Sequence, residues 1–88
     1  MIEGHTDNVP IKTALFKDNW DLSTARANSI VRILTIDNGF DSKLISSVGR
    51  GEFKPIKGND TAEGLAANRR TEVILSPDLS ELYKLLEQ

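Results

Sequence analysis

Cysteine is absent from this 88-residue chain, and histidine and tryptophan each occur once. A chain without cysteine forms neither disulfide bridges nor thiolate metal sites. An excess of positive charge is also lacking, since 11 basic and 13 acidic residues give a net charge of −2, which argues against a nucleic-acid partner. No apolar run approaches the length of a transmembrane helix, and no signal peptide is visible. We therefore expect one small domain without metal or cofactor, which would meet a membrane only through other parts of a parent protein.

The clearest periodic pattern is an amphipathic helix at residues 22–34. Apolar residues recur there at helical spacing and form one stripe. They are Ala27, Ile30, Val31 and Leu34. Ser23 is the predicted N-cap, because its hydroxyl can accept from a backbone N–H of the first turn. Counted from Ser23, Arg26 falls in that turn at the edge of the buried face, where it is suited to receive a carboxylate. The alternative is a surface arginine whose stem covers the core.

Short strands and two further helices are expected around this helix. In chain order the expected elements are strand 1–5, helix 22–34, strand 44–49, helix 59–70, strand 71–75 and helix 76–88. Asp60 or Thr61 can cap the second helix. With right-handed crossovers this order gives an α/β two-layer sandwich, a small mixed sheet packed by helices. We assign residues 1–75 to one domain and residues 76–88 to a C-terminal amphipathic helix.

The segments that flank the long helix carry an aromatic residue and a stop signal. Residues 12–21 are expected to form a polar connection. Trp20, near its end, is predicted to pack as a lid or staple at the helix entrance, with stacking on a ligand as the alternative. After the helix, Gly39 or Asn38 is suited to the left-handed C-cap.

Four separated motifs carry a resemblance to a known family. They are Gly4-His5-Thr6-Asp7-Asn8, Asn19-Trp20-Asp21-Leu22-Ser23 with Ala25-Arg26-Ala27, Val48-Gly49-Arg50-Gly51-Glu52, and Asn68-Arg69-Arg70. In this order they resemble the OmpA-like peptidoglycan-binding domain, whose family includes the periplasmic domains of OmpA, Pal and MotB. The resemblance covers about residues 2–75. The second motif and the Val9-Pro10-Ile11 turn are similar to the flagellar-stator branch, although many envelope proteins share this form.

The resemblance implies non-covalent binding of the peptidoglycan stem peptide through meso-diaminopimelate. The family's ligand-binding aspartate and arginine match Asp7 and Arg26. This fits the chemistry, because a zwitterionic amino-acid end needs a carboxylate for its ammonium and a fork of donors for its carboxylate. Backbone N–H groups near Thr6 and at the helix entrance, Leu22 and Ser23, are expected to take the remaining oxygens. The implied role is to anchor an envelope protein to the cell wall in the periplasm.

A second set of residues is expected to support the pocket. They are His5, Asn8, Asn68, Arg69 and Arg70. We predict that His5 is a structural residue that fixes the turn at Asp7. For the three residues of the last motif, bracing the pocket is the leading expectation, and contact of one arginine with ligand is the alternative. The family form has a basic residue after Gly64, where this chain has Leu65, so no extra charge contact is expected from that position.

Other classes of function fit the sequence less well than wall binding. A metal-dependent hydrolase needs about three protein ligands, and one histidine without cysteine does not provide them. A serine hydrolase turn of the Gly-x-Ser-x-Gly type is also missing, so we expect no enzyme activity. A stator-like anchor within a motor complex, or an interaction domain that has lost its ligand, remain as alternatives. Family domains carry a strand and a helix before the Gly-His-Thr-Asp motif, so we expect a piece of a longer envelope protein and a homodimer of the short chain.

Overall fold

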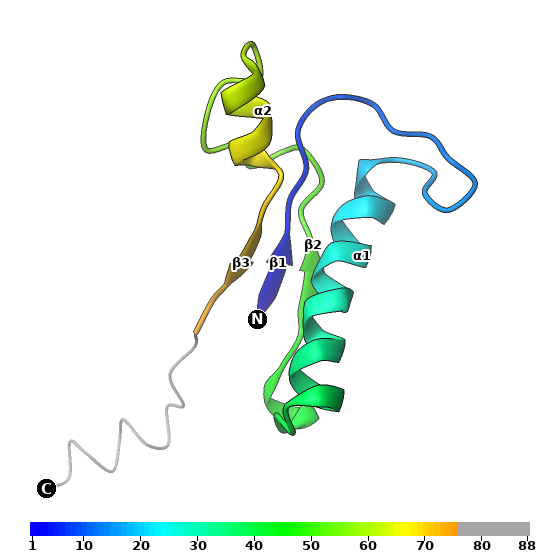
Figure 1. The fold of residues 1–88 in the computed structure, drawn as a ribbon, viewed down its shortest axis with the longest axis vertical. Coiled ribbons are helices and arrows are strands. Elements are labelled where there is room, and N and C mark those ends of the chain that lie inside the picture. Colours follow the sequence, from blue (N-terminus) through cyan, green and yellow to red (C-terminus); the bar gives the residue numbers. More distant parts are fainter. Residues whose placement is uncertain (76–88) are drawn as a thin grey trace, which may run out of the picture.

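The structure, a computed structural model, describes residues 1–75 (Figure 1). The helix predicted at 76–88 lies outside the described residues. The elements are β1 (Ile2–Gly4), α1 (Asn19–Arg32), the π-helical turn η1 (Ile33–Asp37), the 3₁₀ turn η2 (Ser42–Leu44), β2 (Ser47–Gly49), α2 (Ala62–Asn68) and β3 (Thr71–Val73). No helix in this part of the chain is long and apolar enough to cross a membrane.

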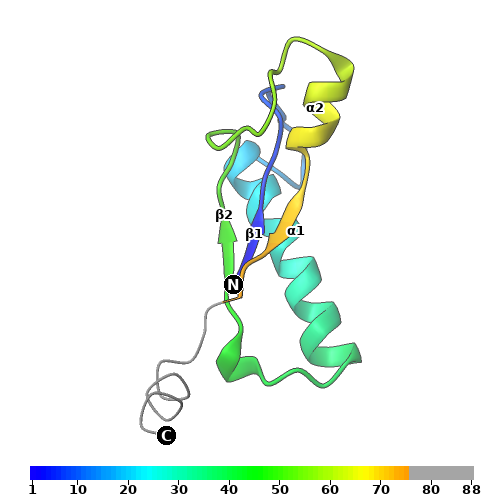
Figure 2. The same ribbon diagram turned by 90° about the vertical axis from the view of Figure 1, so that its left-hand side faces the viewer.

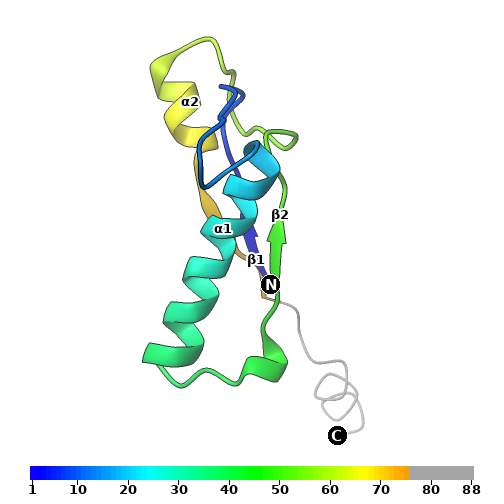
Figure 3. The ribbon, with the colours of Figure 1, turned by 90° about the vertical axis from the view of Figure 1, so that its right-hand side faces the viewer.

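The three strands form one mixed sheet with β1 in the centre. The strand order is β2-β1-β3. Strand β1 runs parallel to β2, with Ile2 opposite Ser47, and antiparallel to β3, with Ile2 opposite Val73. Because parallel neighbours need a crossover, α1 returns the chain along one face of the sheet (Figure 3). Figure 2 shows the other face of the sheet in front of α1, and α2 lies beyond one end of the strands. The predicted small mixed sheet packed by helices is confirmed.

Glycines on two strands let α1 lie directly against the sheet. A Cβ on Gly4 would collide with the carbonyl oxygen of Ser23, and a Cβ on Gly49 would collide with the hydroxyl of Thr24. On the same side, Ile2 and Ala27 are the buried apolar residues of the described core. The close approach therefore replaces the larger apolar interface that a helix on a sheet usually has.

The N-cap of the helix lies five residues earlier than predicted. Asp18 is the N-cap, and its Oδ1 accepts from the backbone N–H of Asp21 at 3.0 Å. The prediction of Ser23 as N-cap is wrong, because Ser23 lies inside α1 and is fully buried. Its hydroxyl donates to the carbonyl of Trp20 and accepts from the N–H of Gly51 at 2.9 Å. Arg26 therefore lies beyond the first turn of α1, and the argument from the helix entrance does not apply to it.

The bounds of other elements also differ from the predicted ones by a few residues. The polar connection ends at Asp18, so Trp20 is in the first turn of α1 and not before it. Strands β2 and β3 are shorter than expected, and the start of the predicted second strand is instead the turn η2. Gly39 has the predicted positive φ of 69°. Thr61 is the cap of α2, accepting from the N–H of Gly64 at 2.9 Å.

Candidate ligand-binding site

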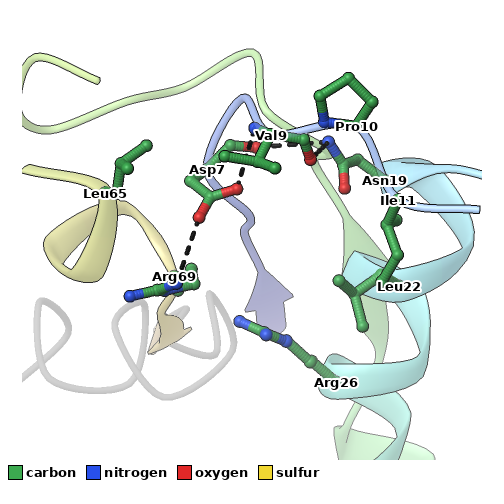
Figure 4. Close-up of a pocket in the computed structure, with 9 residues that line it drawn as sticks. All are labelled: Asp7, Val9, Pro10, Ile11, Asn19, Leu22, Arg26, Leu65 and Arg69. Atoms are coloured by element: carbon green, nitrogen blue, oxygen red, sulfur yellow. Dashed lines mark hydrogen bonds and ion pairs between the residues drawn. The ribbon is translucent and has the colours of Figure 1, made fainter. Parts of the chain in front are cut away.

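A hollow of about 300 Å³ lies between the segment after β1, the first half of α1 and the region of α2 (Figure 4). The residues that line it are Asp7, Val9, Pro10, Ile11, Asn19, Leu22, Arg26, Leu65 and Arg69. Its walls are mainly apolar, and its charged groups are one carboxylate and two guanidinium groups. This composition is typical of small-ligand sites, in which a few polar groups orient a largely apolar contact.

Asp7 is held in place from both sides. It is the third residue after the central strand β1 and is only 7% exposed. Its Oδ1 accepts from the backbone N–H of Val9 at 3.0 Å, an Asx-turn that explains why an aspartate suits this position. Its Oδ2 lies 3.4 Å from the guanidinium of Arg69. The carboxylate is thus buried, oriented and already beside one cation.

Arg26 enters the same hollow from α1. Its Nη1 donates a long hydrogen bond, 3.5 Å, to the carbonyl of His5. In Figure 4 its guanidinium points toward the space below Asp7 and Arg69. One weak contact uses little of the five-donor capacity of a guanidinium. The side chain can therefore give a planar fork of donors to an incoming anion.

The turn that carries the apolar wall is tied to the helix by Asn19. Its side-chain amide donates to the carbonyls of Asp7, at 3.3 Å, and Val9, at 3.2 Å. This places Pro10 and Ile11 above Leu22, so that apolar side chains form one side of the hollow (Figure 4). Reasoning from the sequence did not name Asn19 as a site residue. The sequence feature that could have identified it is its position as the first residue of the second family motif.

The structure brings together only some of the residues predicted to bind ligand. Asp7, Arg26 and the side chain of Leu22 line the hollow. Two of the expected backbone donors, the N–H groups of Thr6 and Leu22, are already used within the fold. The N–H of Thr6 donates to the carbonyl of Gly51 at 2.9 Å, and the N–H of Leu22 donates to that of Asp18 at 3.2 Å. Because the helix starts earlier than predicted, its free N–H groups lie elsewhere.

The predicted supporting residues divide into two groups. Arg69 lines the hollow itself, whereas Asn8 is exposed beside a second hollow. Asn68 is fully buried and holds the loop before α2, since its side chain bonds to backbone groups of Ile56 and Lys57. Arg70 bonds to Glu72 and to backbone carbonyls, among them that of Lys54 at 2.9 Å. Neither of these last two residues lines the hollow.

His5 does not fix the turn at Asp7, so that prediction is wrong. Its Nε2 is 3.1 Å from Oε1 of Glu3, the residue two places earlier on the same face of the strand, while its Nδ1 is buried without a partner. The turn is stabilised by its own backbone, through the Asx-turn described above. Alternation along β1 directs the side chain of His5 to the face that Glu3 occupies, away from α1.

Glu3, His5 and Glu72 bring their ligand-type atoms within 4.8 Å of one another. Each carboxylate already has a guanidinium partner. The hydrogen bonds from Arg50 to Glu3 lower the pKa of that carboxyl, assisted by His5, although its burial opposes the shift. The hydrogen bond from Arg70 lowers the pKa of Glu72 in the same way. A metal ion would have to displace both arginines, so we interpret this cluster as a closed ion-pair network.

Fold and site together define a small α/β domain that carries a charged, apolar-walled pocket. A family model described as the OmpA family matches residues 1–69, and the chain belongs to this family. Among curated relatives, it is 47% identical over 77 residues to motility protein B of Bacillus subtilis, covering 88% of this chain and 30% of the relative. It is 41% identical over 71 residues to outer membrane porin F of Pseudomonas aeruginosa, covering 81% of this chain and 19% of the porin.

Solved structures show the same similarity. The C-terminal domain of Helicobacter pylori MotB matches 98% of this chain and 67% of its own, with a TM-score of 0.80 and 30% identity. A structure described as the cell wall anchor of the T6SS from Pseudomonas aeruginosa matches 80% of this chain and 48% of its own, with a TM-score of 0.74 and 38% identity. The chain thus spans less than a third of the length of these two curated relatives.

Proposed function

We propose that this domain binds the peptide stem of peptidoglycan non-covalently, and so anchors an envelope protein to the cell wall in the periplasm. The observation that carries the proposal is the placement of Asp7, Arg26 and Arg69 around one hollow. The similarity to the cell wall anchor of the T6SS from Pseudomonas aeruginosa supports the same interpretation.

The ligand chemistry that suits the hollow is the free amino-acid end of diaminopimelate. Its ammonium would pair with Asp7, and its carboxylate would receive the bidentate donors of Arg26. The methylene chain between the two centres of diaminopimelate would lie along the apolar wall formed by Ile11 and Leu22. Each part of this amino-acid end therefore has a matching group in the hollow.

Arg69 gives the hollow an additional positive charge. The negative charge of Asp7 offsets one guanidinium, so the net charge of the three charged lining residues is +1. A stem peptide that ends in a free carboxylate carries at least one negative charge beyond its zwitterionic end. We propose that Arg69 shares Asp7 with the ligand ammonium and faces this additional carboxylate, because its side chain is 47% exposed and can move.

We infer binding without catalysis. The nine lining residues include no serine, cysteine or histidine, and the one histidine of the chain is buried against Glu3 on the other face of β1. General acid–base or nucleophilic catalysis needs such groups within reach of the substrate. Asp7 is the remaining candidate, and its two oxygens are held by Val9 and Arg69.

Selectivity between stem peptides tests the proposal directly. The domain should bind a diaminopimelate tripeptide at least about tenfold more tightly than the matching lysine tripeptide, because lysine lacks the carboxylate that Arg26 receives; this is roughly 1.4 kcal/mol, less than one charged hydrogen bond. Calorimetric titration of both peptides at one ionic strength measures the ratio. Equal affinities would show that Arg26 contacts something else, and absence of binding to both would overturn the proposal.

A further inference from the structure

A second hollow, of about 420 Å³, lies beside the first and contains the stacked aromatic pair of the described chain. Its lining is Asn8, Pro10, Ile11, Lys12, Lys17, Asp18, Asn19, Trp20, Glu52 and Phe53. Three of these residues, Pro10, Ile11 and Asn19, also line the first hollow. The two hollows therefore lie side by side and share these residues as a wall, so a single ligand with two parts can reach both.

The aromatic pair is exposed and yet held in a fixed position. The rings of Trp20 and Phe53 stack with centroids 5.1 Å apart and planes at 29°, and the two residues remain 51% and 63% exposed. The loop that carries Phe53 is attached to α1 because the N–H of Gly51 donates to the buried hydroxyl of Ser23. It is also attached to the segment after β1 because the carbonyl of Gly51 accepts from the N–H of Thr6. A rigid aromatic surface left in water is typical of a binding site.

The polar groups around this surface suit a neutral ligand with many hydroxyl groups. Lys12 and Lys17 supply donors, Asp18 and Glu52 supply acceptors, and their charges sum to zero. A pyranose ring has one apolar C–H face and a rim of hydroxyl groups. Its apolar face can cover an aromatic ring while its hydroxyl groups bond to surrounding charged and amide side chains.

We propose that Trp20 and Phe53 form a sugar-binding subsite that holds a ring of the glycan strand next to the bound stem peptide. The inference rests on the proposed function, because the stem pocket sets which ligand is present. In peptidoglycan the diaminopimelate residue is the third of the stem, so an extended stem places the sugar about 10 Å away. Arg26 and Trp20 are six residues apart on α1, about 9 Å along its axis. The stem, with the methylene chain of diaminopimelate beyond it, is thus long enough to span the two subsites.

The test compares one peptide with and without its sugars. We expect the disaccharide tripeptide to bind about tenfold more tightly than the same tripeptide freed of sugar, a difference of the size that aromatic contacts produce. Phe53→Ala should bring the affinity for the disaccharide tripeptide close to that for the bare tripeptide. Phe40→Ala is the matched control, because Phe40 is similarly exposed, 56%, and follows η1 at the far end of α1.

The single tryptophan gives a second, independent readout. Its emission should change on addition of the disaccharide tripeptide and stay constant with the bare tripeptide, since only the sugar reaches Trp20. Equal affinities for the two ligands, together with unchanged emission, would overturn the sugar subsite and leave the stem pocket intact. Absence of binding to both ligands would overturn the proposed function, and the subsite with it. If Phe53→Ala lowers the melting temperature, Phe53→Leu keeps the bulk and removes the aromatic face.

Discussion

Single residues decide the chemistry of the pocket, because its few charged groups sit among apolar side chains. Asp7 is buried and held by Val9 and Arg69, whereas Arg26 makes one long contact and keeps most of its donors for a ligand. A fixed carboxylate and a guanidinium with unused donors can recognise both ends of a zwitterion at once. The same residues in solvent would bind such a ligand weakly, since water screens exposed ion pairs.

Removing the guanidinium should therefore abolish most of the binding. For Arg26→Ala we expect a loss of about 1.5–3 kcal/mol in binding free energy, roughly 10- to 150-fold in affinity, because a charge-assisted contact is lost. Arg26→Lys should recover only part, since an ammonium group does not reproduce the planar fork. Calorimetry with the diaminopimelate tripeptide measures both. Arg32→Ala, an exposed arginine later on the same helix, is the control, and wild-type affinity in Arg26→Ala would remove Arg26 from the site.

At the scale of elements, the contact between α1 and the sheet places both halves of the pocket. Strand β1 leads into Asp7, α1 carries Arg26, and the distance between them depends on how closely helix and strand approach. Gly4 and Gly49 set that approach, because α1 occupies the space where their side chains would be. Binding geometry and fold stability are therefore coupled at this contact.

Adding one methyl group at this contact should destabilise the fold strongly. In Gly4→Ala the new Cβ would meet the backbone carbonyl of Ser23, which cannot rotate away, so we expect a loss of roughly 2–4 kcal/mol in the free energy of unfolding. Urea denaturation followed by circular dichroism measures it. Gly58→Ala is the matched control, because its Cβ would meet only the end of the Asp60 side chain. A similar stability of the two variants would contradict the close approach.

The ion-pair network on the other face of β1 makes stability depend on pH. Arg50 lowers the pKa of Glu3 below its ordinary value of 4.5, so the folded state holds this carboxylate ionised more readily than the unfolded state does. The contribution is present above pH 4.5 and is lost as the pH falls through the lowered pKa. We expect the unfolding free energy of Glu3→Gln to fall less steeply than that of the wild type below pH 4.5. Asp37→Asn, at an exposed position, should keep the wild-type slope, and parallel curves for Glu3→Gln would refute this role.

On the scale of the whole molecule, the sheet leaves apolar side chains and strand edges open among the described residues. The outer edges of β2 and β3 have no strand partner there. At the edge formed by β3, Val73 is 62% exposed, and Leu75, just after the strand, is 87% exposed. An open edge next to apolar side chains favours pairing with another copy, which in a symmetric dimer uses the same surface twice.

We propose that this chain forms a homodimer through β3. Light scattering over a range of concentrations should show a molar mass that rises from one chain to two. Leu75→Lys should shift the molecule toward the monomer, because a charge would be buried at the new interface. Leu15→Lys, on the connection before α1 and 83% exposed, is the control. A single-chain mass at every concentration would rule out the dimer.

Much of the molecule was predictable from local signals in the sequence. Apolar spacing predicted the long helix, Gly39 its end and Thr61 a cap of the second helix, because caps and left-handed turns depend on the residue itself and its nearest neighbours. The order of strands and helices predicted the small mixed sheet. The four motifs predicted the family, and they singled out Asp7 and Arg26, which the structure places on one hollow.

Only the tertiary structure decided what each polar side chain contacts. Ser23 has the residue type of a helix cap, but Asp18 precedes it and the loop at Gly51 needs a buried acceptor, so Ser23 lies inside α1. His5 precedes Asp7 in the sequence, yet strand alternation turns it toward Glu3. The aromatic pair joins residues 33 positions apart, a contact that no local pattern specifies. Local propensity acts over a few residues, whereas these contacts form only when distant segments pack together.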